Sequence, residues 1–268
     1  MTRPFKIVAH RGTPGGMIPE NTSASAMLAF KSGADVIEID VTCSTDGVAY
    51  AFHEGAELEN LGFDESRSTF TSAEIDEFRY VWGQIQGEPV PVERLQDLLE
   101  FVRGTEAEIH IDRAWFWWEH TLPVLDEARM DDQLFIKVPA TTSALGRLER
   151  MQPRARTIPI VKSVDVLPRI FGSSLRVPVI ELIGMNPADK QLSVETIDML
   201  HDDGYRIMAN AEVVGKPLFG GYDDEVSIFE DPESGWGKLV ERGVDLIQTD
   251  FPWLLKAYRD ELAARNDA

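Results

Sequence analysis

Two carboxylates stand two residues apart inside an apolar stretch. Glu38 and Asp40 alternate with Ile37, Ile39 and Val41. This period of two is typical of a strand, so both acids should point to one face and the aliphatic residues to the other. Neighbouring carboxylates repel each other unless a positive group neutralises them, and paired hard oxygens suit Ca²⁺ or Mg²⁺. We therefore expect Glu38 and Asp40 to bind a divalent cation, Ca²⁺ or Mg²⁺, with Mn²⁺ as a further candidate.

Two of the five histidines flank this acid pair in the sequence. His10 ends an apolar run over residues 6–9, and His53 ends a run that turns back after Asp46-Gly47. An imidazole has a pKa near neutrality and can therefore donate or accept a proton during catalysis. We predict that His10 and His53 are the catalytic acid and base, without assigning the two roles.

Several motifs occur together with these residues. They are His10-Arg11-Gly12, Pro19-Glu20-Asn21-Thr22, Gly33-Ala34-Asp35, Glu38-Ile39-Asp40-Val41, Thr45-Asp46-Gly47 and, near the end of the chain, Gly243-Val244-Asp245 and Thr249-Asp250-Phe251-Pro252. In type and order they resemble the motifs of the glycerophosphodiester phosphodiesterase family. Because they lie near both ends of the chain, the resemblance spans almost all of it. It implies a metal-dependent hydrolase that converts glycerophosphodiesters to an alcohol and glycerol phosphate.

A third metal ligand is expected from a neighbouring strand. The run Ile109-His110-Ile111-Asp112 repeats the alternation, and Asp112 stands at its end. The family's version of this strand ends in Glu-x-Lys, whereas this chain has Asp112-Arg113-Ala114. We predict that Asp112 completes the metal site, with His110 or Glu20 as the next candidates; His110 could also be a minor ligand.

Three cationic side chains are expected to bind the substrate phosphate. A guanidinium fork matches the two non-bridging oxygens of a phosphodiester, which favours Arg11. Arg113 or Lys137 would replace the lysine missing from the Glu-x-Lys position. His120 and His201 fall on predicted helices, and we expect both at the surface.

These residues need a framework that collects strand ends at one place, and the chain supplies alternating strands and helices. The expected strands after residue 91 are Glu108 to Asp112, Gln133 to Val138, Thr157 to Val161, Val177 to Ile183, Tyr205 to Asn210 and Leu246 to Thr249. The expected helices are Val92 to Val102, Glu119 to Ala128, Ser143 to Met151, Val164 to Phe171, Ser193 to Asp203, Gly235 to Arg242 and one from Trp253. With the first two strands, this gives eight βα units and predicts a (βα)8 TIM barrel with its chemistry at the carboxyl ends of the strands.

Residues 54–91 interrupt this alternation, with one short helix expected from residue 71 onward. We interpret them as an insertion after the second strand, too short for an independent core, within a single domain over residues 1–268.

Composition limits the partners. The formal charge of −20 and the pI near 4.6 disfavour nucleic acid and anionic lipid surfaces. The first strand begins too early for a secretory signal before it, and no apolar run approaches ~18 residues. We expect a cytoplasmic protein that acts on a small phosphodiester without stable membrane association; the oligomeric state is not predicted. The single Cys43 is expected to be buried.

Two competing functions remain at this level. One is a lyase-type phospholipase of the same barrel group, and the other is a non-catalytic phosphate-ester binder, for which the altered Asp112-Arg113-Ala114 would be a sign of lost activity. The aromatic cluster Trp115-Phe116-Trp117-Trp118 is either barrel core or a wall for the substrate alcohol. We expect residues 215–227 to form a rim loop, either a lid or a surface turn.

Overall fold

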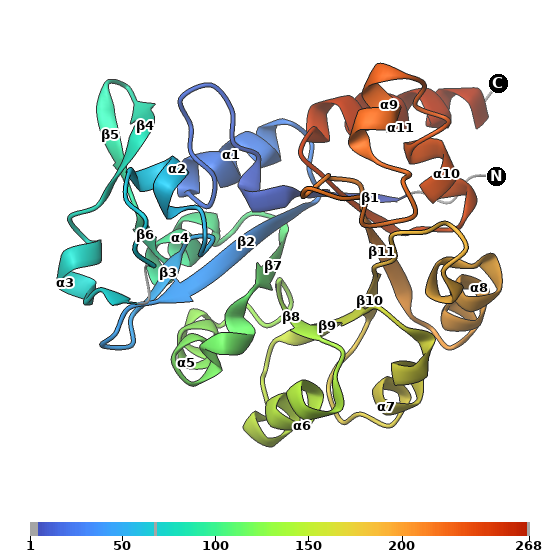
Figure 1. Cartoon of the computed structure of the whole chain (residues 1–268), viewed down its shortest axis with the longest axis horizontal. Coiled ribbons are helices and arrows are strands. Elements are labelled where there is room, and N and C mark those ends of the chain that lie inside the picture. The colour runs from blue at the N-terminus through green and yellow to red at the C-terminus, as the bar shows by residue number, and fades with distance from the viewer. Residues whose placement is uncertain (1–4, 67–68, 267–268) are drawn as a thin grey trace.

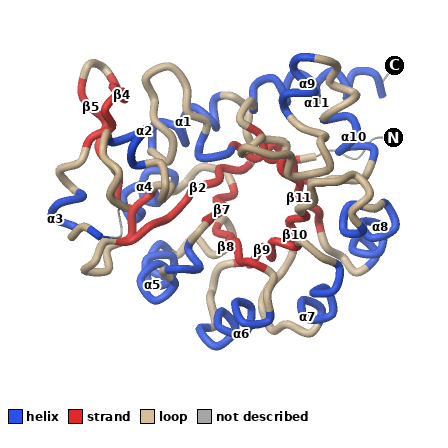
Figure 2. The backbone as a smooth tube through the Cα atoms, in the orientation of Figure 1, coloured by secondary structure: helices blue, strands red, loops and turns tan. Residues whose placement is uncertain are grey.

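The computed structural model describes residues 5–66 and 69–266, and its centre is a closed ring of eight parallel strands (Figures 1 and 2). Around the ring the order is β1, β2, β7, β8, β9, β10, β11 and β12, and β12 pairs back onto β1. The bounds are β1 Lys6–Ala9, β2 Val36–Cys43, β7 Glu108–Asp112, β8 Leu134–Pro139, β9 Arg156–Val161, β10 Val179–Leu182, β11 Arg206–Asn210 and β12 Leu246–Thr249. The predicted TIM barrel is confirmed.

Helices form an outer layer around this ring (Figure 2). They are α1 Ser23–Lys31, α4 Leu95–Val102, α5 Trp118–Ala128, α6 Thr142–Met151, α7 Leu167–Phe171, α8 Val194–Asp202, α9 Asp224–Phe229, α10 Trp236–Glu241 and α11 Pro252–Asn266. Short 3-10 turns are η1 His10–Gly12, η3 Ala114–Phe116, η4 Val164–Val166 and η5 Lys190–Leu192. Thr22 caps α1 by accepting from the backbone N–H of Ser25, with Ser25 reciprocating in a capping box.

The barrel interior has an apolar layer beneath a polar one. Val8, Val36, Phe135, Ile158, Val179, Met208 and Leu246 form a small buried cluster inside the ring. A larger cluster joins the outer faces of the strands to the helices and includes Cys43, which is buried as expected. Because side chains alternate along a strand, residues two positions after the inner apolar layer also face inward. This arrangement places charged and polar groups at the carboxyl ends of the strands.

The insertion after β2 is more structured than expected. After β3 Ala49–Ala51 come α2 Glu57–Leu61, α3 Ser72–Ile75, a hairpin of β4 Arg79–Ile85 and β5 Glu88–Pro91, and β6 Glu93–Arg94. Figure 1 shows this part projecting to one side of the barrel. It has its own apolar cluster with β3, which includes Tyr50, Phe52, Ile75 and Tyr80. Because this cluster depends on Tyr50 and Phe52, which precede residues 54–91, the expectation that the insertion is too short for an independent core stays a prediction.

Smaller corrections concern the second half of the chain. The helix expected over Val164 to Phe171 is a 3-10 turn followed by α7, with Pro168 in its first turn. Helix α9 begins inside the expected rim loop, where Asp223 caps it. His201 is only 12% exposed in its side chain, because its Nε2 lies 2.8 Å from Asp245 Oδ2, whereas His120 is exposed as predicted.

No helix among the described residues is long and apolar enough to cross a membrane. That residues 1–268 form one domain stays a prediction.

Candidate active site

Glu38, Asp40 and Asp112 meet at the carboxyl ends of β2 and β7. The parallel register pairs Asp40 with Asp112, and a ligand oxygen from each acid lies within 4.8 Å of the other two. Glu38 and Asp40 are buried, and Glu38 Oε1 has no hydrogen-bond partner among the described residues. Burial and the charge of Asp40 raise the pKa of Glu38 to about 8. A buried acid cluster with an unused oxygen needs a positive charge, so these three residues fit a divalent cation.

His10 begins η1, directly after β1, and is held by a carboxylate. Its Nδ1 lies 2.8 Å from Asp250 Oδ1, just past the end of β12. Burial opposes the charged imidazolium, but the hydrogen bond to Asp250 and the charges of Glu212 and Glu38 outweigh burial and raise the pKa of His10 to about 10. These acids favour the protonated ring, but Arg11 Nε donates to His10 Nε2, so a proton can occupy Nε2 only when Arg11 moves away.

Arg11 lies between the histidine and the acids. It adopts a left-handed backbone conformation, with φ of 51°, and its backbone N–H donates to Glu38 Oε2 at 2.8 Å. The guanidinium Nε lies 3.2 Å from His10 Nε2 and 3.4 Å from Asp40 Oδ2, and Nη1 donates to both oxygens of Glu20. Nη2 has no hydrogen bond to any described residue.

His53 returns to the acid pair through the β2–β3 hairpin. The backbone N–H of Phe52 donates to the carbonyl of Asp40 at 3.0 Å, which places the next residue beside the site. Arg113, at the N-cap of η3 with φ of 58°, has its Nη1 3.2 Å from His53 Nε2. Since a guanidinium can only donate, the lone pair of the ring is on Nε2. Burial, together with the charges of Arg11 and Arg113, lowers the pKa of His53.

Lys137 is fully buried inside the barrel. Its Nζ lies 3.1 Å from Asp112 Oδ2, from Glu181 Oε2 and from Gln248 Oε1. The contact to Gln248 is a hydrogen bond, and the contacts to Asp112 and Glu181 are ion pairs. This geometry favours a role in holding Asp112 over direct contact with a phosphate.

His110 does not join the acid cluster. It pairs in register with Glu38 and faces the barrel interior, where its ring packs against Phe135 at 5.0 Å between centroids. Neither ring nitrogen has a hydrogen-bond partner among the described residues, and burial lowers the pKa of His110 well below its ordinary value. His110 shares a face of β7 with Asp112 but lies two residues closer to the amino end of the strand, and therefore deeper in the barrel.

Several polar residues of the site were not assigned from the sequence. Asn21 Oδ1 accepts from the backbone N–H of Asp40 at 2.9 Å, and its amide nitrogen lies 3.3 Å from Asp40 Oδ2. At β12, Gln248 donates to Glu212 Oε1 at 2.8 Å. Burial raises the pKa of Glu212 to about 8. Asn21 and Asp250 belong to the motifs listed above, which was a usable signal; Glu212 follows β11 without any motif.

Two pockets are lined by residues that follow the carboxyl ends of barrel strands, and none of the three acids lines either pocket. One, of about 440 Å³, is lined by His10, Arg11, Pro14, Glu20, Val213, Val214, Asp250, Phe251 and Trp253. The other, of about 300 Å³, is lined by Trp115, Pro139, Ala140, Thr141, Ile160, Lys162, Ser163 and Val166. Trp118 is fully buried, so the aromatic cluster is partly core and partly pocket wall.

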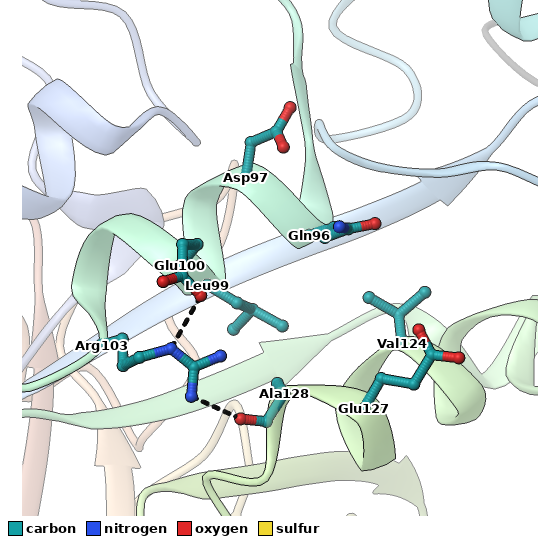
Figure 3. Close-up of a pocket in the computed structure, with 8 residues that line it drawn as sticks. All are labelled: Gln96, Asp97, Leu99, Glu100, Arg103, Val124, Glu127 and Ala128. Carbon is teal, nitrogen blue, oxygen red and sulfur yellow. Dashed lines mark hydrogen bonds and ion pairs between the residues drawn. The ribbon is translucent and has the colours of Figure 1, made fainter.

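A further cleft lies between α4 and α5, in the outer helix layer (Figure 3). There Arg103 bridges Glu100 and the carbonyl of Ala128. It contains none of the predicted site residues.

Solved structures resemble this chain over nearly its whole length. A glycerophosphoryl diester phosphodiesterase of Parabacteroides distasonis gives a TM-score of 0.77 at 20% identity, covering 97% of this chain and 88% of that one. A glycerophosphodiester phosphodiesterase of Agrobacterium tumefaciens gives 0.69 at 25% identity, covering 96% and 99%. An Oleispira antarctica phosphodiesterase, in complex with the product sn-glycerol-3-phosphate, gives 0.71 at 19% identity, covering 95% and 96%.

Comparisons of the amino-acid sequence give relatives of the same kind as the comparison of structures. The model of the glycerophosphoryl diester phosphodiesterase family matches residues 10–254. A glycerophosphodiester phosphodiesterase of Arabidopsis thaliana is 43% identical over 53 residues, which make up 20% of this chain and 14% of the plant protein.

Proposed function

Because the chain belongs to the glycerophosphoryl diester phosphodiesterase family, we propose that it hydrolyses glycerophosphodiesters with water to an alcohol and glycerol phosphate. Membership confirms the resemblance noted in the sequence and the class of enzyme expected from it, a phosphoric diester hydrolase. The observation that carries the proposal is the acid triad of Glu38, Asp40 and Asp112, with His10 and His53 brought beside it. A cytoplasmic location is part of the proposal.

Glu38, Asp40 and Asp112 would hold a divalent cation, Ca²⁺, Mg²⁺ or Mn²⁺, which would supply positive charge against the phosphodiester. Asn21 fixes Asp40, and Lys137 fixes Asp112, so both acids are oriented before any ligand enters. Arg11 offers Nη2 to a non-bridging oxygen, and Arg113 lies close enough to His53 to contact the same phosphate. Lys137 would reach the phosphate only by releasing one of its three partners.

The surroundings of the two histidines divide the proton transfers between them. His53 faces a guanidinium and carries its lone pair on Nε2, which suits a base that takes a proton from the attacking water once the phosphate draws Arg113 away. His10 Nδ1 is held by Asp250 and its Nε2 accepts from Arg11 Nε; once the phosphate draws Arg11 away, the surrounding acids favour a proton on Nε2, which suits the acid for the leaving alkoxide. The oxygen of water bonds to phosphorus while its proton passes to His53, and the bond from phosphorus to the alcohol oxygen breaks while the proton of His10 passes to the leaving alkoxide.

A panel of glycerophosphodiesters tests the proposal, with Mg²⁺, Ca²⁺ or Mn²⁺ added and with a chelator. Glycerol phosphate should appear only with a cation. His53→Ala should lower turnover by about 10²-fold or more, whereas His120→Ala, an exposed histidine outside the site, should match the wild type. Binding of the diesters without turnover under all conditions would favour the non-catalytic binder instead.

The chemical identity of the first product tests the alternative hypothesis of a lyase-type phospholipase. If a hydroxyl of the substrate attacks in place of water, a cyclic phosphate accumulates and no ¹⁸O from labelled water enters the first product. Hydrolysis places one ¹⁸O in the glycerol phosphate.

A further inference from the structure

The insertion packs on the loop that follows η1 and leads to α1 (Figure 1). A Cβ at Gly83, on β4, would collide with the ring of Pro19, so the strand and the loop are in direct contact. Tyr80, on the same strand, donates from its hydroxyl to the backbone carbonyl of Glu20 at 3.0 Å. The insertion therefore holds the backbone of the loop that carries Glu20.

Two side chains of the insertion also reach the Glu20 carboxylate. Trp82 Nε1, on β4, donates to Asn60 Oδ1 at 3.1 Å. Because an indole can only donate, this contact turns the amide nitrogen of Asn60, on α2, away from Trp82. Asn60 Nδ2 donates to Glu20 Oε1 at 3.3 Å. Asn60 is 6% exposed and the Glu20 side chain 14% exposed, so water competes little for this bond.

Glu20 is the most complete anchor of the Arg11 guanidinium. Both oxygens of Glu20 accept from Arg11 Nη1, at 3.1 and 3.0 Å. Arg11 Nε, by contrast, is shared between His10 Nε2 at 3.2 Å and Asp40 Oδ2 at 3.4 Å. In the proposed reaction Nε leaves His10, whereas the contacts of Nη1 with Glu20 can persist. Because a guanidinium binds phosphate through a planar fork, the place of Glu20 decides where Arg11 can meet the phosphate.

We propose, on the basis of the proposed function, that Asn60 is a positioning residue for the reaction. It fixes the Glu20 carboxylate, and Glu20 in turn holds the Arg11 guanidinium where it binds the substrate phosphate. Without the amide of Asn60, the Glu20 carboxylate loses a donor and can rotate, and Arg11 moves with it. The insertion thereby sets the affinity of the barrel site for phosphate esters.

The test is a double-mutant cycle on the dissociation constant of glycerol phosphate, measured by calorimetry with Mg²⁺, Ca²⁺ or Mn²⁺ at saturation. Asn60→Ala should raise this constant about fivefold, the usual size of an effect passed through a contact network. In an Arg11→Met background, Asn60→Ala should raise it less than about twofold, because the residue through which Asn60 acts is gone. An equal effect of Asn60→Ala in both backgrounds would overturn the proposal.

Turnover of a diester gives a second readout. Asn60→Ala should raise KM about fivefold and change kcat less than about twofold, because Arg11 contacts the phosphate in the bound diester and in the transition state alike. A lower kcat with an unchanged KM would contradict the proposed role.

The matched control is Tyr50→Phe. It removes a hydroxyl that donates to Ser72 and Asp76 within the aromatic cluster shared with Tyr80. This substitution should lower the melting temperature and leave the dissociation constant unchanged; the same change in both variants would overturn the proposal. If Asn60→Ala does not fold, Trp82→Phe decides, because it removes only the indole N–H and should raise the constant about twofold or more.

Failure of the proposed function gives a different result, because the titration needs no turnover. If no diester releases glycerol phosphate with any cation but the cycle shows the coupling, hydrolysis is refuted and the role of Asn60 stands. If the wild type binds no glycerol phosphate with any of the cations, the role of Asn60 is overturned.

Discussion

Asp250→Asn should separate the effect of the negative charge of Asp250 from the effect of its side-chain shape. Asn retains an acceptor oxygen for His10 Nδ1, which lies 2.8 Å from Asp250 Oδ1, but removes the negative charge. A hydrogen bond to a charged group contributes ~1.5–3 kcal/mol, and one pKa unit corresponds to ~1.4 kcal/mol. Because the Asp250 side chain is 43% exposed, solvent screens it and the lower end applies. The pKa of His10 should therefore fall by about one unit.

If His10 is the general acid, its deprotonation sets the alkaline limb of the kcat profile. Loss of the Asp250 charge lowers the pKa of His10, so the limb should move by about one pH unit toward acid in Asp250→Asn. The assay is kcat against pH with a saturating diester and a fixed cation concentration.

Asp245→Asn is the matched control. Asp245 makes an equivalent 2.8 Å contact to His201, next to the other end of β12. This substitution should lower the melting temperature without moving the profile. An alkaline limb that stays in place in Asp250→Asn would refute the assignment of His10 as the acid.

Three other predictions follow from the site. Asp112→Asn should weaken cation affinity far more than stability, as measured by calorimetry and melting; an unchanged titration would place the third ligand elsewhere. Lys137→Met should destabilise the fold by about 3–5 kcal/mol, because it leaves Asp112 and Glu181 as unpaired acids, and a normal denaturation midpoint would contradict this. Glu212 has a folded pKa raised to about 8, so it keeps its proton in the folded state and loses it in the unfolded chain between about pH 4.5 and 8. Wild-type stability should therefore fall relative to Glu212→Gln by up to about 1.4 kcal/mol per pH unit across this window, and a constant difference would be evidence against burial of the acid.

The identity and order of the eight barrel strands were readable from the sequence because hydrophobic alternation and short βα connections are local properties, whereas the β4–β5 hairpin was not predicted. The same locality explains why Glu38 and Asp40 were found, since two residues on one strand share a face wherever the strand lies. His53 was predicted beside Asp40 for a similar reason, because the Asp46-Gly47 turn fixes the return path of a short hairpin.

The ion-pair network depended on the closed barrel. Closure brings Lys137 of β8 against Gln248 of β12, which is 111 residues away, and no local pattern specifies that contact. It also places Asp250 on His10 across 240 residues, and thereby favours the protonated form of that imidazole. His110 shows the limit of alternation, which gives the face of a residue but not its depth in the barrel. The sequence by itself determined which residue types line the strands, and the tertiary structure determined which of them meet, because pKa values and ligand sets depend on distances that only closure of the ring establishes.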